Sequence, residues 1–159
     1  MDKILNINQA ISTARKLRDQ GKTIVLAGGC FDILHKGHIL FLKAAKKQGD
    51  MLFLLLESDR NITKRKGEGR PLNSQKNRAS VLSTIEDIDY IIPLTGVTKD
   101  KEYDRIMGKI KPDIVAMTRG DKQIGKRTKQ CELFGIELKL VIDKIGNSST
   151  TALINQISN

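Results

Sequence analysis

The stretch TIVLAGGCFDILHKGH, residues 23–38, decides the fold of this chain. It opens with TIVLA, a short apolar and β-branched run, which predicts a buried strand that ends at Gly28 and Gly29. Beyond the glycines, the apolar positions of residues 39–45 repeat with a helical period, which predicts a helix that begins near His35. A strand, a glycine turn and a helix in this order are typical of the first unit of a parallel α/β sheet.

The rest of the chain continues the alternation of strands and helices. Apolar runs predict further strands at residues 51–56, 88–94, 114–117 and 138–142. Helical periodicity predicts helices at residues 7–17, 74–84, 101–110 and 126–134, and a last helix that starts within 148–151. Continuous apolar strands between amphipathic helices indicate a sheet covered on both faces. We therefore predict an α/β fold, a Rossmann-like doubly wound parallel sheet of about five strands with helices on both faces, in a single domain over residues 1–159 whose first 22 residues are a helix preceding the core.

The composition is that of a cytosolic globular protein. Hydrophobic residues make up 39% of the chain and charged residues 29%, which is too apolar for a disordered protein. The longest apolar run, residues 51–56, is far shorter than the roughly 18 residues that a membrane span needs, and residues 1–3 do not begin a signal peptide. Without an export signal, Cys30 and Cys131 are interpreted as reduced thiols. We expect a cytoplasmic protein with no membrane partner.

The net charge of +10 is concentrated in the first half of the chain. Residues 1–80 hold 16 Lys and Arg against 7 Asp and Glu, whereas residues 81–159 hold 12 against 11. Residues 60–78, interpreted as a basic loop that leads into the next helix, carry seven cations against the single acid Glu68. Such a segment attracts polyanions, and nucleic acid, an acidic membrane surface and a phosphorylated small molecule all qualify.

Both histidines of the chain lie at the start of the helix after the first strand. His35 and His38 are three residues apart, so both rings project from one side of the first helical turn. A helix N-terminus presents unpaired N–H groups to an anion, and two imidazoles beside it can donate hydrogen bonds to oxygens that gain charge in phosphoryl or nucleotidyl transfer. The alternative for His35 is a capping or core role and for His38 a surface position. A zinc site would need a third ligand, and none is close in sequence, so no metal site is predicted.

The histidine motif resembles the signature of the HxGH nucleotidyltransferase (cytidylyltransferase-like) superfamily. That signature, Gly-x-Phe-Asp-x-x-His-x-Gly-His, is filled at every named position by Gly29, Phe31, Asp32, His35, Gly37 and His38. The family's second signature, a Ser/Thr cluster before the final helix, is similar to residues 147–151, and the resemblance covers roughly residues 23–158. It implies an enzyme that joins a nucleoside monophosphate from a nucleoside triphosphate to a phosphorylated acceptor and releases pyrophosphate, with Mg²⁺ assisting.

The resemblance also implies which residues contact the nucleotide. His35 and His38 would stabilise the charge on the α-phosphate, and Cys30 and Phe31 would contact the triphosphate through their backbone. Residues 147–151 would form a second helix N-terminus facing the β- and γ-phosphates, although such a string is also a common N-cap. The complete nucleotide-binding set implied in this way is Gly29, Cys30, Phe31, Gly37, Asp121, Lys144, Asn147, Ser148, Ser149, Thr150 and Thr151.

Further site residues are implied within the basic segment and directly before it. Lys66 is the catalytic candidate and Lys64 the substrate-binding one, with Arg65 a further candidate because the register of this segment is ambiguous. Arg78 resembles a family arginine near the active site, and Asp59 is assigned to substrate binding. For any single cation here, a solvated surface position remains the alternative.

Within the superfamily, the chain most resembles the adenylyltransferase domain of ADP-heptose synthesis. The resemblance is carried by residues 29–35, 57–59, 69–73, 111–113, 120–121 and 149–151. It implies ATP as the nucleotide, a sugar 1-phosphate such as heptose 1-phosphate as the acceptor, and a homodimer. Lys144 stands where cytidylyltransferases of the family carry an arginine, and it keeps the charge but loses the planar fork.

Three other functions remain open at this point. The first is a cytidylyltransferase for glycerol 3-phosphate or another alcohol phosphate, and the second is an adenylyltransferase that acts on a flavin nucleotide. The third is a basic nucleic-acid-binding module. An aromatic content of 4% with no Trp disfavours base stacking on a single strand, so we expect no nucleic-acid partner.

Overall fold

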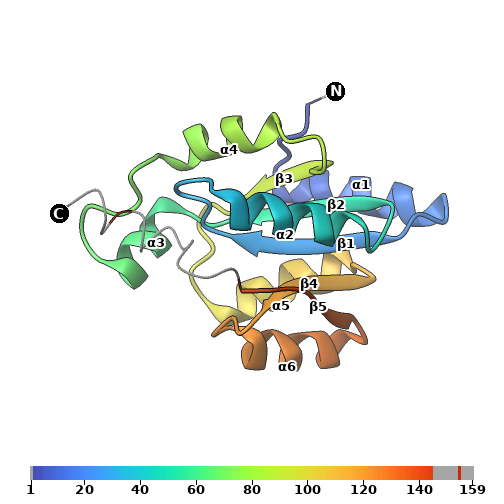
Figure 1. Ribbon diagram of the computed structural model, residues 1–159. Coiled ribbons are helices and arrows are strands. Elements are labelled where there is room, and N and C mark those ends of the chain that lie inside the picture. The colour runs from blue at the N-terminus through green and yellow to red at the C-terminus, as the bar shows by residue number, and fades with distance from the viewer. Residues whose placement is uncertain (1, 145–153, 155–159) are drawn as a thin grey trace.

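A single parallel sheet forms the centre of the computed structural model, which describes residues 2–144 and 154 (Figure 1). Its strands are β1 Ile24–Gly29, β2 Met51–Leu56, β3 Tyr90–Pro93, β4 Ile114–Arg119 and β5 Glu137–Asp143. They lie in the order β3-β2-β1-β4-β5, and each neighbouring pair is parallel. The predicted doubly wound α/β fold is confirmed. The last helix, expected to start within residues 148–151, falls outside the described residues.

Helices cover both faces of this sheet. The described helices are α1 Ile7–Asp19, α2 Lys36–Lys46, α3 Asp59–Lys66, α4 Gln75–Ser83, α5 Asp100–Ile110 and α6 Ile124–Phe134. Apolar side chains of α2 and α4 pack in the core on one face, and those of α1, α5 and α6 pack in the core on the other. In Figure 1, α2 and α4 lie above α5 and α6, while α3 projects beyond the ends of the strands. None of the described helices has the length and apolar character needed to cross a bilayer.

The apolar run of β2 shows why the strands have no polar face. Leu52, Leu54 and Leu56 belong to the core beneath α2 and α4, whereas Phe53 and Leu55 face the core beneath α1 and α5. Successive side chains of a strand point to opposite faces, so a strand covered by helices on both sides must be apolar at every position. This is the physical reason why the continuous apolar runs were correct predictors of strands.

The strand order reverses at β1, which lies between β2 and β4. The chain leaves β1 through α2 toward one side of the sheet and returns later to place β4 on the other side. Connections that diverge in this way leave a crevice at the carboxyl ends of the strands, where ligands of doubly wound folds bind. The histidine motif therefore follows the strand at which a site is expected.

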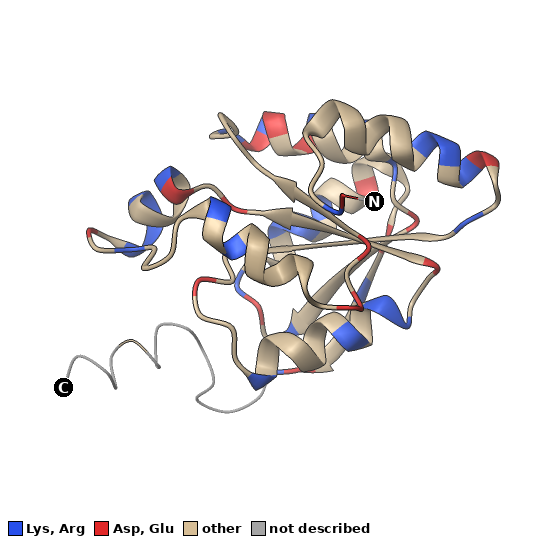
Figure 2. Cartoon of the chain, turned by 90° about the horizontal axis from the view of Figure 1, so that it is seen from above, with Lys and Arg blue, Asp and Glu red and all other residues tan. Residues whose placement is uncertain are grey.

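Residues 60–66 of the basic segment lie in a helix, and the prediction of a loop was wrong there. In α3, the hydroxyl of Ser58 accepts the N–H of Asn61 at 3.2 Å and caps the first turn. Ile62 is fully buried, and the last turn carries the residues Lys64, Arg65 and Lys66, where cations favour the helix dipole. Figure 2 shows this helix at the left of the view with Lys and Arg along it, and further cations on the other helices.

Candidate active site

A cavity of about 430 Å³ lies at the carboxyl ends of the strands, beside the reversal of strand order. This volume is that of a small-molecule site. Of the site residues predicted from the sequence, those that line it are Gly29, Cys30, Phe31, His35, Gly37, His38, Lys66, Asp121 and Lys144. The predicted residues Asn147, Ser148, Ser149, Thr150 and Thr151 lie outside the described residues. The motif and the cavity therefore coincide.

The two histidines form one stacked pair at the start of α2. His35 is the N-cap of the helix, and its Nδ1 accepts the N–H of Gly37 at 3.1 Å. In a neutral imidazole whose Nδ1 accepts, the proton is on Nε2. That Nε2 is buried and has no hydrogen-bond partner among the described residues, so its N–H is available to a ligand. The ring of His38 stacks on that of His35, with centroids 3.8 Å apart and an interplanar angle of 24°.

Both imidazoles are held in the neutral form. The pKa of His38 is lowered to about 4, first by burial and then by the charges of His35 and Lys66, while a hydrogen bond with the backbone of Ile33 raises it. Burial also lowers the pKa of His35. At neutral pH the pair therefore offers the Nε2–H of His35 to a ligand, while the N–H of His38 is donated to the backbone of Ile33. The positive charge at this end of the cavity comes from Lys66 and the helix N-terminus.

The lowered pKa of His38 makes the stability of the protein depend on pH. The unfolded chain takes up a proton on this residue near pH 6.5, whereas the folded protein does so only near pH 4. The free energy of unfolding should therefore fall as the pH falls from about 6.5 to about 4, by on the order of 2 kcal/mol from this group. Urea unfolding of the wild type and of His38→Asn across this range isolates the contribution. Identical pH dependence in the two proteins would contradict it.

Phe31 and Gly29 shape the surface beneath the histidines. Phe31 adopts a left-handed backbone with φ of 50°, and its buried ring lies 5.0 Å from the ring of His38. A Cβ at Gly29 would lie 2.7 Å from Cε2 of Phe31, closer than two carbons approach. The glycine is therefore needed so that the chain can pass beneath the aromatic ring that supports His38.

α3 brings two of its three adjacent cations to the cavity. All three are exposed, and Arg65 and Lys66 line the cavity whereas Lys64 does not. Successive residues of a helix point about 100° apart, so three in a row cannot face one cavity. The structure thus puts Lys66 and the further candidate Arg65 at the cavity and leaves Lys64 outside it.

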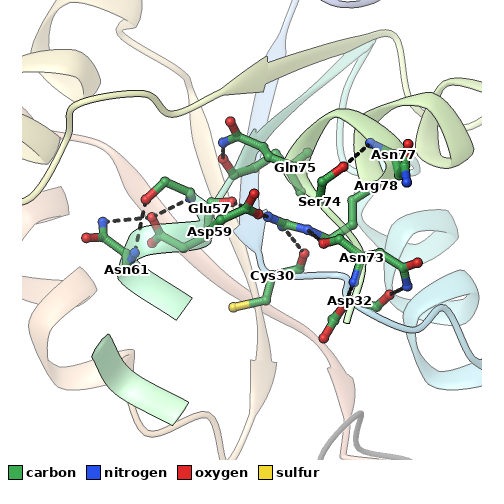
Figure 3. Close-up of polar contacts among 12 residues, drawn as sticks. Cys30, Asp32, Glu57, Asp59, Asn61, Asn73, Ser74, Gln75, Asn77 and Arg78 are labelled. Atoms are coloured by element: carbon green, nitrogen blue, oxygen red, sulfur yellow. Dashed lines mark hydrogen bonds and ion pairs between the residues drawn. The ribbon is translucent and has the colours of Figure 1, made fainter. Parts of the chain in front are cut away.

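Arg78 is a buried structural residue and not a cavity-lining one. Its side chain is 1% exposed, and its donors reach the carbonyl oxygens of Asn73 at 3.0 Å, Cys30 at 2.6 Å and Glu57 at 3.0 Å. It also donates to Oδ1 of Asp59 at 2.6 Å (Figure 3). Neither Arg78 nor Asp59 lines the cavity. These contacts tie the ends of β1 and β2 to the start of α4, and the substrate-binding role of the two side chains stays a prediction.

Asp32, the acid of the family signature, also makes its bonds within the protein. Its carboxylate is buried and accepts the N–H groups of Leu72 at 2.8 Å and Asn73 at 2.9 Å. Nε of Arg70 lies 3.4 Å from the same carboxylate. Asp32 therefore fixes the segment between α3 and α4 against the motif and does not line the cavity.

Sequence reasoning missed a second polar group at the cavity, centred on Glu57. Its Oε1 accepts the N–H of Ser58 at 3.0 Å and Nδ2 of Asn61 at 2.9 Å. Its Oε2 accepts Nη2 of Arg65 at 2.8 Å and the hydroxyl of Tyr103 at 2.7 Å. Arg127 and Gln123 also line the cavity. Only the tertiary fold brings α3, α5 and α6 together, so no spacing in the sequence could have indicated this group.

The chain is similar to proteins of one family over most of its length. The cytidylyltransferase-like family model matches residues 26–150. The chain is 39% identical to the bifunctional protein HldE of Campylobacter fetus and 37% identical to that of Wolinella succinogenes, each over 98% of this chain. These matches cover 31% of each relative, so the chain spans about a third of the length of the curated relatives it matches.

Two solved structures share the fold. A lipopolysaccharide core biosynthesis protein from Thermoplasma volcanium is 31% identical, with a TM-score of 0.59 over 79% of this chain and 98% of that one. A pantoate-beta-alanine ligase from Francisella tularensis, complexed with beta-gamma ATP and beta-alanine, has a TM-score of 0.65 over 93% of this chain and 69% of that one. At 16% identity the second likeness shows the fold alone.

The resemblance read from the histidine motif is therefore confirmed on independent grounds. The family model covers the strands, the cavity and the motif, and the motif lies at the point where strand order reverses. This chain belongs to the cytidylyltransferase-like family of nucleotidyltransferases.

Proposed function

We propose that the chain transfers AMP from ATP to a sugar 1-phosphate, such as a heptose 1-phosphate, and releases pyrophosphate. The observation that carries the proposal is the neutral, stacked pair of His35 and His38 at the N-terminus of α2, inside the cavity. The resemblance to the adenylyltransferase domain of ADP-heptose synthesis favours ATP and the heptose acceptor. The likeness to a lipopolysaccharide core biosynthesis protein supports a sugar substrate.

The reaction is a direct displacement at the α-phosphorus of ATP. A phosphate oxygen of the acceptor forms a bond to that phosphorus while the bond to the bridging oxygen of pyrophosphate breaks. The attacking phosphate already carries negative charge, so the step needs no general base. His35 and His38 stabilise the charge on the α-phosphate oxygens, which grows in the transition state. Lys66 supplies positive charge at the same end of the cavity.

The predicted nucleotide-binding residues that line the cavity are assigned to the triphosphate and its nucleoside. Gly29, Cys30, Phe31 and Gly37 present backbone around the N-terminus of α2, a site suited to phosphate. Lys144, just after the end of β5, adds a further cation to the cavity. The segment 147–151 is assigned to the β- and γ-phosphates on the family signature alone.

Mg²⁺ is proposed to enter with the triphosphate. The described residues contain no group of three or more His, Cys, Asp or Glu side chains that could hold a metal ion. This fits an ion held mainly by phosphate oxygens and water, with one or two carboxylates at most. Asp121 lines the cavity and would supply such a carboxylate, while the bound ion would offset the charge of the triphosphate.

We further propose a homodimer that acts in the cytoplasm.

A pyrophosphate-release panel tests the proposed function. ATP and CTP, each with Mg²⁺, are combined with heptose 1-phosphate, glycerol 3-phosphate and a flavin mononucleotide. We expect the fastest release with ATP and heptose 1-phosphate. Faster release with CTP and glycerol 3-phosphate would move the assignment to a cytidylyltransferase. No release with any pair, together with tight and salt-dependent binding of a generic oligonucleotide, would replace the enzyme by a nucleic-acid-binding module.

A further inference from the structure

The cavity has two walls that come from opposite faces of the sheet. The wall formed by α2 carries the residues His35, His38 and Phe41, and the other wall carries Tyr103 and Met107 from α5 and Arg127 from α6. The proposed function places the transfer chemistry on the wall of α2. The proposed function assigns no role to the wall of α5 and α6.

Arg127 carries the positive charge of this second wall. Its guanidinium lies over the ring of Tyr103, with Cζ 5.4 Å from the ring centroid, and its Nη1 donates to Oε1 of Gln130 at 2.5 Å. Within residues 2–144, no carboxylate lies within ion-pair distance of Arg127. A guanidinium has five N–H donors, so these contacts leave donors for a ligand. The result is a partly buried, uncompensated cation at a small-molecule cavity.

Tyr103 is fixed beneath Arg127 by a carboxylate that is itself fully engaged. Its hydroxyl donates to Oε2 of Glu57 at 2.7 Å, and burial together with this carboxylate raises the pKa of Tyr103 to about 12. The hydroxyl therefore keeps its proton and its bond at physiological pH. Both oxygens of Glu57 already accept two hydrogen bonds, so Glu57 cannot act as a base or a ligand at the cavity. Its contribution is to hold the ring on which Arg127 lies.

The wall of α5 and α6 is suited to the phosphate group of the acceptor. In an in-line transfer, the attacking oxygen and the leaving pyrophosphate lie on opposite sides of the α-phosphorus. When the triphosphate occupies the wall of α2, the acceptor phosphate has to enter through the side of the cavity that the triphosphate leaves open. That side is the wall of α5 and α6, and a guanidinium is the side chain best suited to bind a phosphate there.

We propose that Arg127, held on Tyr103, binds the phosphate group of the acceptor, and that Glu57 is a positioning residue for this subsite. The proposal rests on the proposed function, because it takes the nucleotide to occupy the wall of α2. It extends that function by assigning the recognition of a phosphorylated acceptor to a helix outside both family signatures.

Kinetics of Arg127→Gln test the subsite directly. A charge-assisted hydrogen bond to phosphate is lost, so KM for heptose 1-phosphate should rise about tenfold to a hundredfold, while KM for ATP changes by less than about twofold. Lys129→Gln removes an exposed cation from the same helix and should change neither value. Glu57→Gln should raise KM for the acceptor with little change in KM for ATP. A rise in KM for ATP with Arg127→Gln, or no change in either KM, would overturn the proposal.

Calorimetry without nucleotide separates this proposal from the proposed function. Heptose 1-phosphate, mannose 1-phosphate and unphosphorylated heptose are titrated into the wild type and into Arg127→Gln. Binding of the sugar phosphates that the substitution weakens at least tenfold supports the subsite, even if the panel finds no pyrophosphate release and the proposed function fails. Binding of sugar phosphates that the substitution leaves unchanged, or no binding to the wild type, overturns the subsite even if the enzyme releases pyrophosphate.

Discussion

Replacing His35 or His38 with Ala should lower the turnover number for pyrophosphate release by at least about a hundredfold. Both imidazoles stabilise charge that develops only in the transition state, so KM for ATP should change far less than the turnover number. Circular dichroism and urea unfolding should show a folded protein in each case. Lys36→Ala, an exposed position on the same helical turn, should retain wild-type turnover.

The stacked geometry adds a second expectation for the pair. The rings lie 3.8 Å apart and act on the same phosphate, so the double variant His35→Ala with His38→Ala should lose much less than the product of the two single losses. Wild-type turnover in both single variants would sink the role of the histidines. Fully multiplicative losses would show that the two rings act on different groups.

Replacing Arg78 with Ala should lower the free energy of unfolding by about 3 to 5 kcal/mol. The substitution leaves the carboxylate of Asp59 without its cation and removes a donor from three carbonyl oxygens, those of Cys30, Glu57 and Asn73. Equilibrium urea unfolding measures the loss. Lys76→Ala, an exposed position on α4, should change stability by no more than about 0.5 kcal/mol.

The same variant separates the structural role of Arg78 from a substrate-binding one. A structural residue should lower stability strongly, and any loss of activity should accompany it because the carbonyl of Cys30 directly precedes the cavity-lining Phe31. If Arg78→Ala has the same free energy of unfolding as Lys76→Ala but a higher KM for the acceptor, Arg78 binds substrate and is not a structural residue.

The first unit of the fold and one wall of the site were predictable from the sequence. The apolar run of β1, the glycines after it and the spacing of His35 and His38 are local features, and local sequence decides a strand, a turn and the first turn of a helix. The cavity forms at the end of this unit because strand order reverses there. This reversal of strand order is a property of the fold class, so predicting the class also predicted the position of the cavity.

The second wall was not predictable, because its residues meet only through tertiary structure. Glu57, which directly follows β2, and Tyr103 of α5 are 46 residues apart in sequence and are joined by a hydrogen bond. α3 escaped prediction because it is eight residues long and has a single fully buried aliphatic side chain, Ile62, which gives no periodic pattern. A cap at Ser58 and three cations in the last turn were the available signals.

The structure shows that the cations of the basic segment serve two different purposes. Of its seven cations, three are committed to acids within the protein: Arg65 to Glu57, Arg70 to Asp32 and Arg78 to Asp59. Much of the local positive charge therefore stabilises the frame of the site, and Lys66 is the cation of α3 that lines the cavity without an ion pair to a described acid. Counting charges in the sequence could not separate these two uses, because both place cations in one segment.

Phosphorus NMR of the reaction shows which phosphorus atom of ATP the acceptor attacks. The wild-type protein is incubated with ATP, Mg²⁺ and heptose 1-phosphate, and the phosphorus-containing products are identified during turnover. We expect an ADP-sugar and pyrophosphate, formed one for one, from attack at the α-phosphorus. ADP together with a sugar bisphosphate would show attack at the γ-phosphorus and would rule out the transfer of AMP.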